Sequence, residues 1–336
     1  MAELTTVADD EAVAHDGPVA RVYDGLAPDT HYELDGLSFT TLPQPGERLA
    51  TFATVNDVHF GETMCGVIEG FDLGPIFSTD PGDDPYPEVM NRGAVADIAA
   101  IAPDAVVVKG DLTNRGSQEE YQDFLDCYRG AFGDRMHHVR GNHDGYHGET
   151  FASDAPFTVD LPGLTLAVVD TVIPLETPGQ VTTGQIEWLG DVAADADRPV
   201  MVFGHHHVWD PTSWARPDTY FGINPDDSER LIGVFAAHPS LIAYSAGHTH
   251  RNRVRRFPDT GDVPWAEVAC VKDFPGTWAE YRVFEGGVLA IHRRISSPEA
   301  LAWSDKTRAM YDGSYFEYAF GDLDERCYPI WPRSAA

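Results

Sequence analysis

The sequence has little positive charge and almost no lysine. Its 336 residues include 54 Asp and Glu but 23 Lys and Arg, a formal net charge of −31, and the lysines are Lys109, Lys272 and Lys306. Nucleic-acid polymers and anionic membranes are held by the summed contacts of many basic side chains. The composition therefore argues against a nucleic-acid polymer or a membrane as partner. A small anionic substrate would need local positive charge, most simply from bound cations.

Cysteine and long apolar runs are also scarce. The four cysteines are widely spaced and form no C-x-x-C pair, which predicts free thiols in a reducing compartment. No apolar stretch approaches the roughly 20 residues that span a membrane. The N-terminal residues have neither the basic nor the apolar region of a signal peptide. We therefore expect a cytoplasmic protein.

The composition changes along the chain and suggests four parts. Residues 1–20 are acidic and poor in large apolar groups, which predicts a mobile arm. Residues 21–49 form a short β-rich extension with a hairpin. Residues 50–295 are the main domain. Residues 296–336 are rich in aromatic side chains, so we expect them to dock on the core or on a second subunit of a homo-oligomer.

The main domain alternates apolar strand-like runs with segments of helical spacing. The runs include TFATV, AVVVK, LTLAVVD, PVMVF and LIAYSA, and the segments between them include EVMNRGAVADIAAIA and SQEEYQDFLDCYRGAF. This alternation indicates an α/β core. The later runs EYRVFEG and GVLAIHRRI favour antiparallel strands joined at Gly286 and Gly287.

Polar motifs follow five apolar runs: TFATV, AVVVK, MHHVR, PVMVF and LIAYSA. The motif residues are Asp57, His59, Asp111, Asn114, Asn142, His143, Asp144, His205, His206, His207, His248 and His250. The carboxyl ends of strands in an α/β sheet meet at a ligand-binding crevice, so these residues can gather in space. In D-x-H and H-x-H, an extended backbone would point both side chains to the same side.

The residue types in these motifs are those of a metal site. Asp, Asn and His without Cys favour a hard-to-borderline cation over thiolate zinc or iron–sulfur chemistry. There are more candidate ligands than one ion needs. Two ions about 3.5–4 Å apart that share a carboxylate would use them all, and such a pair clamps both oxygens of an in-line phosphoryl displacement.

The ordered motifs resemble those of the calcineurin-like metallophosphoesterases. The resemblance covers roughly residues 50–295, and it rests on five motifs in the family's order: D-V-H at 57–59, G-D-L-T-N at 110–114, G-N-H-D at 141–144, H205 and G-H-T-H at 247–250. It implies a four-layer α/β/β/α sandwich, in which helices flank two mixed β-sheets and the metals lie at the strand ends.

The resemblance also implies roles for individual residues. The first ligand set would be Asp57, His59, Asp111 and His250, and the second would be Asp111, Asn142, His205 and His248. Asp111 would bridge two ions of manganese, iron or zinc, and a hydroxide between them would attack phosphorus in line. His143 would bind a phosphate oxygen or assist the leaving group.

One position departs from many relatives, which have Asp where this chain has Asn114. An Asn can still orient His143, but it supplies no charge to raise the pKa of that histidine. We count Asp111, Asn114 and His143 as the catalytic residues. The forms G-D-L-T-N-R-G and G-N-H-D look most like the bacterial phosphodiesterases that hydrolyse cyclic nucleotides and glycerophosphodiesters.

Several alternatives stay open from the sequence. The enzyme could instead be a phosphomonoesterase or a nuclease, or the chain could be a non-catalytic metal-binding or regulatory protein. In the triplet 205–207 we predict His205 as the ligand, His206 as its support and His207 as a substrate contact, but His206 could replace His205. Asp144 fits a turn as well as a direct role.

Substrate contacts beyond the metals are harder to identify. Asn142 and His143 are candidates from the motif that contains them. Arg251 could hold a substrate phosphate, although pairing with the surplus Asp and Glu is the simpler expectation. The Gly/Pro-rich insertion at 60–90 follows His59, so it could be a wall of the pocket or a solvated loop.

Overall fold

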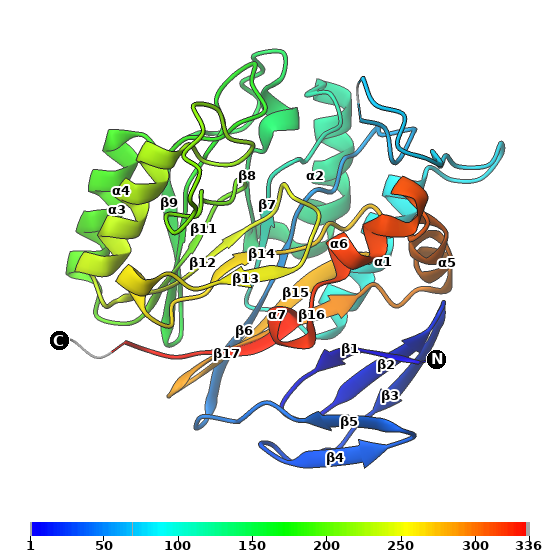
Figure 1. Ribbon diagram of the computed structural model, residues 1–336, viewed down its shortest axis with the longest axis horizontal. Coiled ribbons are helices and arrows are strands. Elements are labelled where there is room, and N and C mark those ends of the chain that lie inside the picture. The colour runs from blue at the N-terminus through cyan, green and yellow to red at the C-terminus, as the bar shows by residue number, and fades with distance from the viewer. Residues whose placement is uncertain (1, 69, 334–336) are drawn as a thin grey trace.

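Two six-stranded mixed β-sheets pack face to face in the computed structural model, which describes residues 2–68 and 70–333 (Figure 1). One sheet contains β6 (Arg48–Val55), β7 (Ala105–Lys109), β8 (Met136–Val139), β15 (Thr277–Phe284), β16 (Gly287–Arg294) and β17 (Cys327–Ile330). The other contains β9 (Phe157–Leu161), β10 (Leu164–Val168), β11 (Val200–Phe203), β12 (Leu241–Ala246), β13 (Arg253–Arg255) and β14 (Trp265–Glu267). Their strand orders are β17-β16-β15-β6-β7-β8 and β13-β14-β12-β11-β10-β9.

The core between the sheets is apolar and includes aromatic side chains from both. The ring of Phe52 on β6 stacks on Tyr281 of β15, with ring centroids 4.6 Å apart, and meets Phe203 of β11 edge to face at 5.9 Å. All three rings are fully buried. Strands that are covered on both faces read as continuous apolar runs, and β7, the AVVVK run, is buried at every residue.

Helices cover the outer faces of both sheets. The helices are α1 (Tyr86–Ala100), α2 (Gln118–Phe132), α3 (Thr183–Asp195), α4 (Pro225–Ala237), α5 (Pro298–Thr307), α6 (Ser314–Phe320) and α7 (Leu323–Arg326). α3 and α4 lie against the β10–β12 side, and α1, α2 and α5 against the β6–β8 side (Figure 1). The predicted four-layer α/β/β/α sandwich is therefore confirmed.

The parallel part of each sheet positions the strand ends. β6 pairs in parallel with β7, and β7 with β8, while β11 pairs in parallel with both β10 and β12. The carboxyl ends of these neighbouring strands therefore meet at one edge of the sandwich. The antiparallel pairing predicted for the EYRVFEG and GVLAIHRRI runs is confirmed in β15 and β16, where Phe284 lies opposite Gly287.

The prediction of a mobile arm at residues 1–20 is wrong for residues 2–20; residue 1 lies outside the described residues. β1 (Glu3–Val7), β2 (Ala12–Asp16) and β3 (Val19–Tyr23) form a three-stranded antiparallel sheet. Val7 and Ala12 are buried against β16. The acidic run is also ion-paired, because Arg282 donates to Asp9 at 2.5 Å and to Asp10 at 2.6 Å. The composition predicts no partner for these carboxylates, but an arginine 272 and 273 positions away in the sequence pairs with them.

The segments on either side of the sandwich also pack on it. β4 (His31–Leu34) and β5 (Leu37–Thr40) form a hairpin within the 21–49 extension. In the C-terminal segment, Trp303 and Tyr315 join the buried cluster beneath α1 and α2, and β17 pairs with β16. No helix among residues 2–68 and 70–333 is long and apolar enough to cross a membrane.

Candidate metal centre

The predicted ligands gather at the strand ends, but their backbone is not extended as expected. Five of them have positive φ angles: Asp57 (52°), His59 (46°), Asp111 (50°), His248 (68°) and His250 (54°). Positive φ is uncommon for residues other than glycine, and such conformations concentrate at functional sites. The side chains of D-x-H and H-x-H therefore converge because the chain turns sharply after each strand.

Two glycines let these turns approach one another. A Cβ atom on Gly141 would collide with the backbone nitrogen and carboxylate of Asp111. A Cβ atom on Gly247 would lie 2.7 Å from the Oδ2 atom of Asp57. Only glycine leaves room for the two carboxylates at these positions.

Asp111 lies between two groups of histidines. Its Oδ2 atom is 3.4 Å from His59 Nε2, and its Oδ1 atom is 3.4 Å from His205 Nε2. The first histidine belongs to the predicted first ligand set and the second to the other set. One carboxylate thus faces both sets, each with a different oxygen.

The first ligand set is closely grouped. Asp57 Oδ1 lies 3.5 Å from His250 Nε2, and ligand atoms of Asp57, His59 and His250 all lie within 4.8 Å of one another. His59 is 2% exposed, yet neither of its ring nitrogens has a hydrogen-bond partner among the described residues. Buried polar atoms are normally paired, so the unpaired nitrogens and adjacent carboxylates fit a metal ion.

The second ligand set is held by backbone carbonyls. His205 Nδ1 donates to the Lys109 carbonyl at 2.8 Å, and His248 Nε2 donates to the Phe221 carbonyl at 2.8 Å. A ring nitrogen that donates carries the proton, which leaves a lone pair on the other nitrogen. His205 Nε2 faces Asn142 Oδ1 at 3.0 Å. When the two rings are neutral, the lone pairs that can bind a cation are therefore those of His205 Nε2 and His248 Nδ1.

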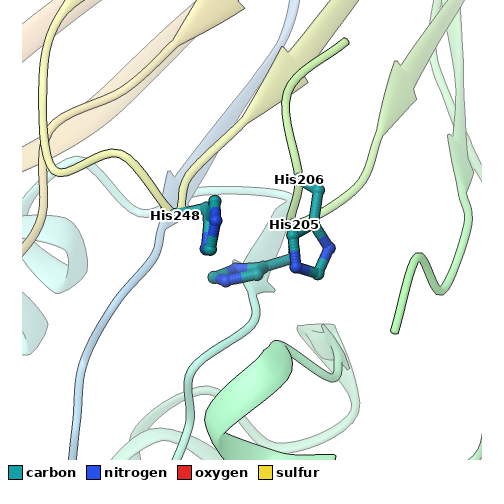
Figure 2. A group of neighbouring side chains, drawn as sticks. All are labelled: His205, His206 and His248. Atoms are coloured by element: carbon teal, nitrogen blue, oxygen red, sulfur yellow. The ribbon is translucent and has the colours of Figure 1, made fainter. Parts of the chain in front are cut away.

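The histidine triplet divides into three different roles. Figure 2 shows His205 and His206 beside His248, which comes from the segment after β12. Both nitrogens of His206 already have partners: Nδ1 accepts from Thr171 Oγ1 at 2.7 Å, and Nε2 donates to the Thr177 carbonyl at 3.0 Å. The Nε2 atom of His205, by contrast, faces oxygens of other predicted ligands. This geometry favours His205 over His206 as the ligand, although His206 lies within reach of the same cluster.

His207 does not join the cluster in the way we expected. It is 4% exposed, and its Nε2 atom lies 2.9 Å from the hydroxyl oxygen of Tyr220. Burial lowers the pKa of His207 to about 4. The ring of His207 is buried, neutral and hydrogen-bonded to a tyrosine, so it is poorly placed to contact a substrate as predicted.

His143 is held by backbone atoms beside the cluster. Its Nδ1 atom donates to the backbone carbonyl of Asn114 at 2.8 Å, and its backbone nitrogen donates to Asp111 Oδ1 at 3.0 Å. Its ring centroid is 4.5 Å from that of His59. Asn114 therefore orients His143 through its main chain, so the exchange of Asp for Asn leaves this contact intact.

Asp144 connects two of the motif loops. Its carboxylate accepts from the backbone nitrogens of Leu112, Thr113 and Gly141 at 2.8–3.0 Å. It is fully buried, and burial together with the charge of Asp111 raises its pKa to about 6. Of the two roles left open for Asp144, the structure shows the structural one.

Arg251 lies in an ion pair. Its Nε atom donates to Glu267 Oε2 at 2.9 Å, and its guanidinium lies over the ring of Tyr318 at 5.1 Å. Glu267 is 1% exposed. The simpler of the two expectations for Arg251, pairing with an acidic residue, is the one the structure shows.

The electrostatics of the cluster favour cation binding. Burial alone would raise the pKa of Asp57, but His250 and His205 lower it to about 2. Burial would likewise lower the pKa of His205, but Asp111 and Asp57 raise it to about 9. The ionised carboxylates thus hold a proton on a neighbouring ring, and a metal cation could replace that proton.

Three charged residues near the first ligand set were not identified from the sequence. Glu62 Oε2 lies 4.0 Å from His59 Nδ1, Asp273 Oδ2 lies 3.7 Å from His250 Nδ1, and Lys272 lies between the two carboxylates. Glu62 is three residues after His59, and lysine is rare in this chain. The rarity of lysine was the signal that could have drawn attention to Lys272.

Comparison with known proteins agrees with the fold. The family model described as calcineurin-like phosphoesterase matches residues 50–252. A crystal structure of a dimetal phosphatase from Danio rerio superposes with a TM-score of 0.52 at 16% identity, over 73% of this chain and 96% of that chain.

The curated relatives include proteins with phosphodiesterase names. The glycerophosphodiester phosphodiesterase GpdQ of Enterobacter lignolyticus is 30% identical over 44% of this chain and 56% of its own length. A probable cyclic nucleotide phosphodiesterase of Synechococcus is 24% identical over 49% of this chain and 68% of its own length. The aligned part thus spans little more than half of the first relative. Since the family model covers more than half of this chain, the protein belongs to the calcineurin-like phosphoesterase family.

Proposed function

We propose that the protein is a two-metal phosphodiesterase that hydrolyses small phosphodiesters of the cyclic-nucleotide or glycerophosphodiester type. The names of the curated relatives support this class of substrate. The net charge of −31 supports a small molecule over a nucleic-acid polymer.

The position of Asp111 is the observation that carries the proposal. Its two carboxylate oxygens each lie 3.4 Å from a histidine of a different ligand set. A carboxylate shared in this way is the expected bridge between two ions. The oxygen and nitrogen donors suit manganese, iron or zinc.

The seven predicted ligands would hold the two ions. The first set would be Asp57, His59, Asp111 and His250, and the second would be Asp111, Asn142, His205 and His248. When bound, the ions would supply Lewis acidity to the phosphate and a water that ionises near neutral pH. Asn142 would bind through Oδ1, because its Nδ2 atom donates to the Tyr146 hydroxyl at 2.6 Å.

His143 would act directly on the substrate. Since its Nδ1 atom donates to the Asn114 carbonyl, Nε2 is the atom left to contact a ligand. Protonated at Nε2, His143 would donate to a phosphate oxygen or to the oxygen of the leaving alcohol. The backbone contact between His143 and Asp111 keeps this ring next to the first ligand set.

The test is hydrolysis by metal-analysed protein. We expect bis(p-nitrophenyl) phosphate to be cleaved with added Mn²⁺, and a cyclic nucleotide or a glycerophosphodiester to have a higher kcat/KM than p-nitrophenyl phosphate. Asp111→Asn should lose more than the roughly 10–100-fold typical of outer-shell changes. The exposed Asp259→Asn is the control and should keep wild-type activity.

Two results would contradict the proposal. Unchanged diester hydrolysis in Asp111→Asn would mean that the activity does not come from this centre. A higher kcat/KM for the monoester would identify a phosphomonoesterase.

A further inference from the structure

A largely buried charged triad lies behind the first ligand set. Its members are Glu62, Lys272 and Asp273, with side chains 13%, 7% and 2% exposed. Lys272 Nζ lies 2.7 Å from Glu62 Oε1, 2.6 Å from Glu62 Oε2 and 3.7 Å from Asp273 Oδ2. The triad thus carries one negative charge in excess, inside the protein.

The excess charge faces the two histidines of the first set. Glu62 Oε2 is 4.0 Å from His59 Nδ1, and this ring nitrogen has no hydrogen-bond partner among the described residues. Asp273 Oδ2 is 3.7 Å from His250 Nδ1. The opposite ring nitrogens, Nε2 in both cases, face Asp111 and Asp57 at 3.4 and 3.5 Å. Each imidazole therefore lies between an outer carboxylate at Nδ1 and an inner carboxylate at Nε2.

The C-terminal segment holds the triad in place. Asp273 Oδ1 accepts from the Tyr315 hydroxyl at 2.7 Å and from Cys270 Sγ at 2.9 Å. Trp303 Nε1 donates to the backbone carbonyl of Lys272 at 2.9 Å. Lys272, Asp273 and these two aromatic residues all lie beyond residue 252, where the match to the family model ends.

Stability alone is a weak reason to bury three charges. Desolvation of a buried ion pair often cancels its Coulomb attraction, and apolar replacements are often as stable. A carboxylate next to the N–H of a ligating histidine can instead serve metal binding, because it sets the tautomer and orientation of the ring.

We propose that Glu62, Lys272 and Asp273 are positioning residues of the first ligand set. The charges of Glu62 and Asp273, 4.0 and 3.7 Å from Nδ1 of His59 and His250, favour a proton on that nitrogen and so leave Nε2 of each ring for the metal, while Lys272 holds both carboxylates. The proposal rests on the metal centre of the proposed function. It assigns the C-terminal segment a part in that centre, through Tyr315 and Trp303.

The test is calorimetric titration of metal-free protein with Mn²⁺. Wild type should bind two equivalents. Glu62→Gln and Asp273→Asn keep the size of each side chain and remove its charge, so each should weaken one equivalent by about 10–100-fold and leave the other unchanged. Glu280→Gln is the matched control, since Glu280 is 2% exposed and pairs with Arg282 and Arg293 on the side of β1–β3.

Thermal unfolding of the metal-free variants separates positioning from folding. A positioning role predicts weaker binding of one ion at a melting temperature no lower than that of Glu280→Gln. If Lys272→Met fails to fold, the double variant Glu62→Gln/Lys272→Met, which leaves this pair uncharged, should weaken the same equivalent.

Other results would overturn the inference. It fails if Glu62→Gln and Asp273→Asn bind both ions as wild type does, or if both equivalents weaken equally. If wild type binds a single ion that these variants still weaken, the positioning role stands and the two-metal function falls.

Discussion

The two ligand sets differ in what lies behind their histidines. His59 and His250 face carboxylates of a buried triad, whereas His205 and His248 donate to the backbone carbonyls of Lys109 and Phe221. Every residue supplies a carbonyl, so the orientation of the second set depends on the path of the chain. The orientation of the first set depends on particular side chains and can be altered by single substitutions.

The largest expected effect is the loss of bound metal when His205, but not the adjacent His206, is replaced by alanine. His205→Ala should lose one of the two metal equivalents, measured by elemental analysis after dialysis. His206→Ala should keep both equivalents, because in the wild type the two ring nitrogens of His206 form hydrogen bonds with Thr171 and Thr177. It should instead lower stability by about 1–3 kcal/mol, since it leaves buried polar groups unpaired.

The comparison of these two variants decides between the adjacent histidines. Loss of metal in His206→Ala with full metal in His205→Ala would reverse the assignment of the ligand. Denaturant unfolding of both metal-free variants provides the stability values.

A smaller effect is expected at Tyr315, which reaches the first set only through Asp273. Tyr315→Phe removes the 2.7 Å hydrogen bond to Asp273 Oδ1 and leaves the carboxylate charge in place. We expect weaker Mn²⁺ binding at one equivalent, by less than in Asp273→Asn, and unchanged binding at the other. Calorimetric titration measures both. If Tyr315→Phe weakened Mn²⁺ binding equally at the second set, the orientation of the two ligand sets would not be independent.

The smallest effect is expected at Asn114. Asn114→Ala removes the side chain, but the backbone carbonyl that accepts from His143 Nδ1 remains. The kcat for diester hydrolysis should stay close to that of wild type, while His143→Ala should lose about 10²–10⁴-fold, the usual contribution of a general acid. A loss in Asn114→Ala as large as that in His143→Ala would mean that the amide itself acts in catalysis.

Much of the centre could be predicted because its motifs are local. Each predicted ligand follows an apolar run within a few residues, and parallel strands place such ends at one edge. The prediction of an extended backbone at D-x-H was wrong, and the reason is also local. Asp57 and His59 have positive φ angles, which a residue other than glycine rarely adopts.

Contacts over long sequence separations were not predictable in the same way. The composition of residues 1–20 predicts a mobile arm, but Arg282 pairs with Asp9 and Asp10 and so ties this segment to β15. Glu62 and Lys272 are 210 positions apart, and neither belongs to one of the strand-end motifs. A single sequence holds no signal for such a pair until the sheets bring them together.

The sequence by itself determined the order of the core strands and motifs along the chain and the donor types at each strand end. Apolar runs and the turns that follow them are local properties. Only the tertiary structure decided which nitrogen of each histidine is free and what lies behind it. Those properties depend on hydrogen bonds to a carbonyl or carboxylate from a distant part of the chain, and packing alone brings these groups within reach.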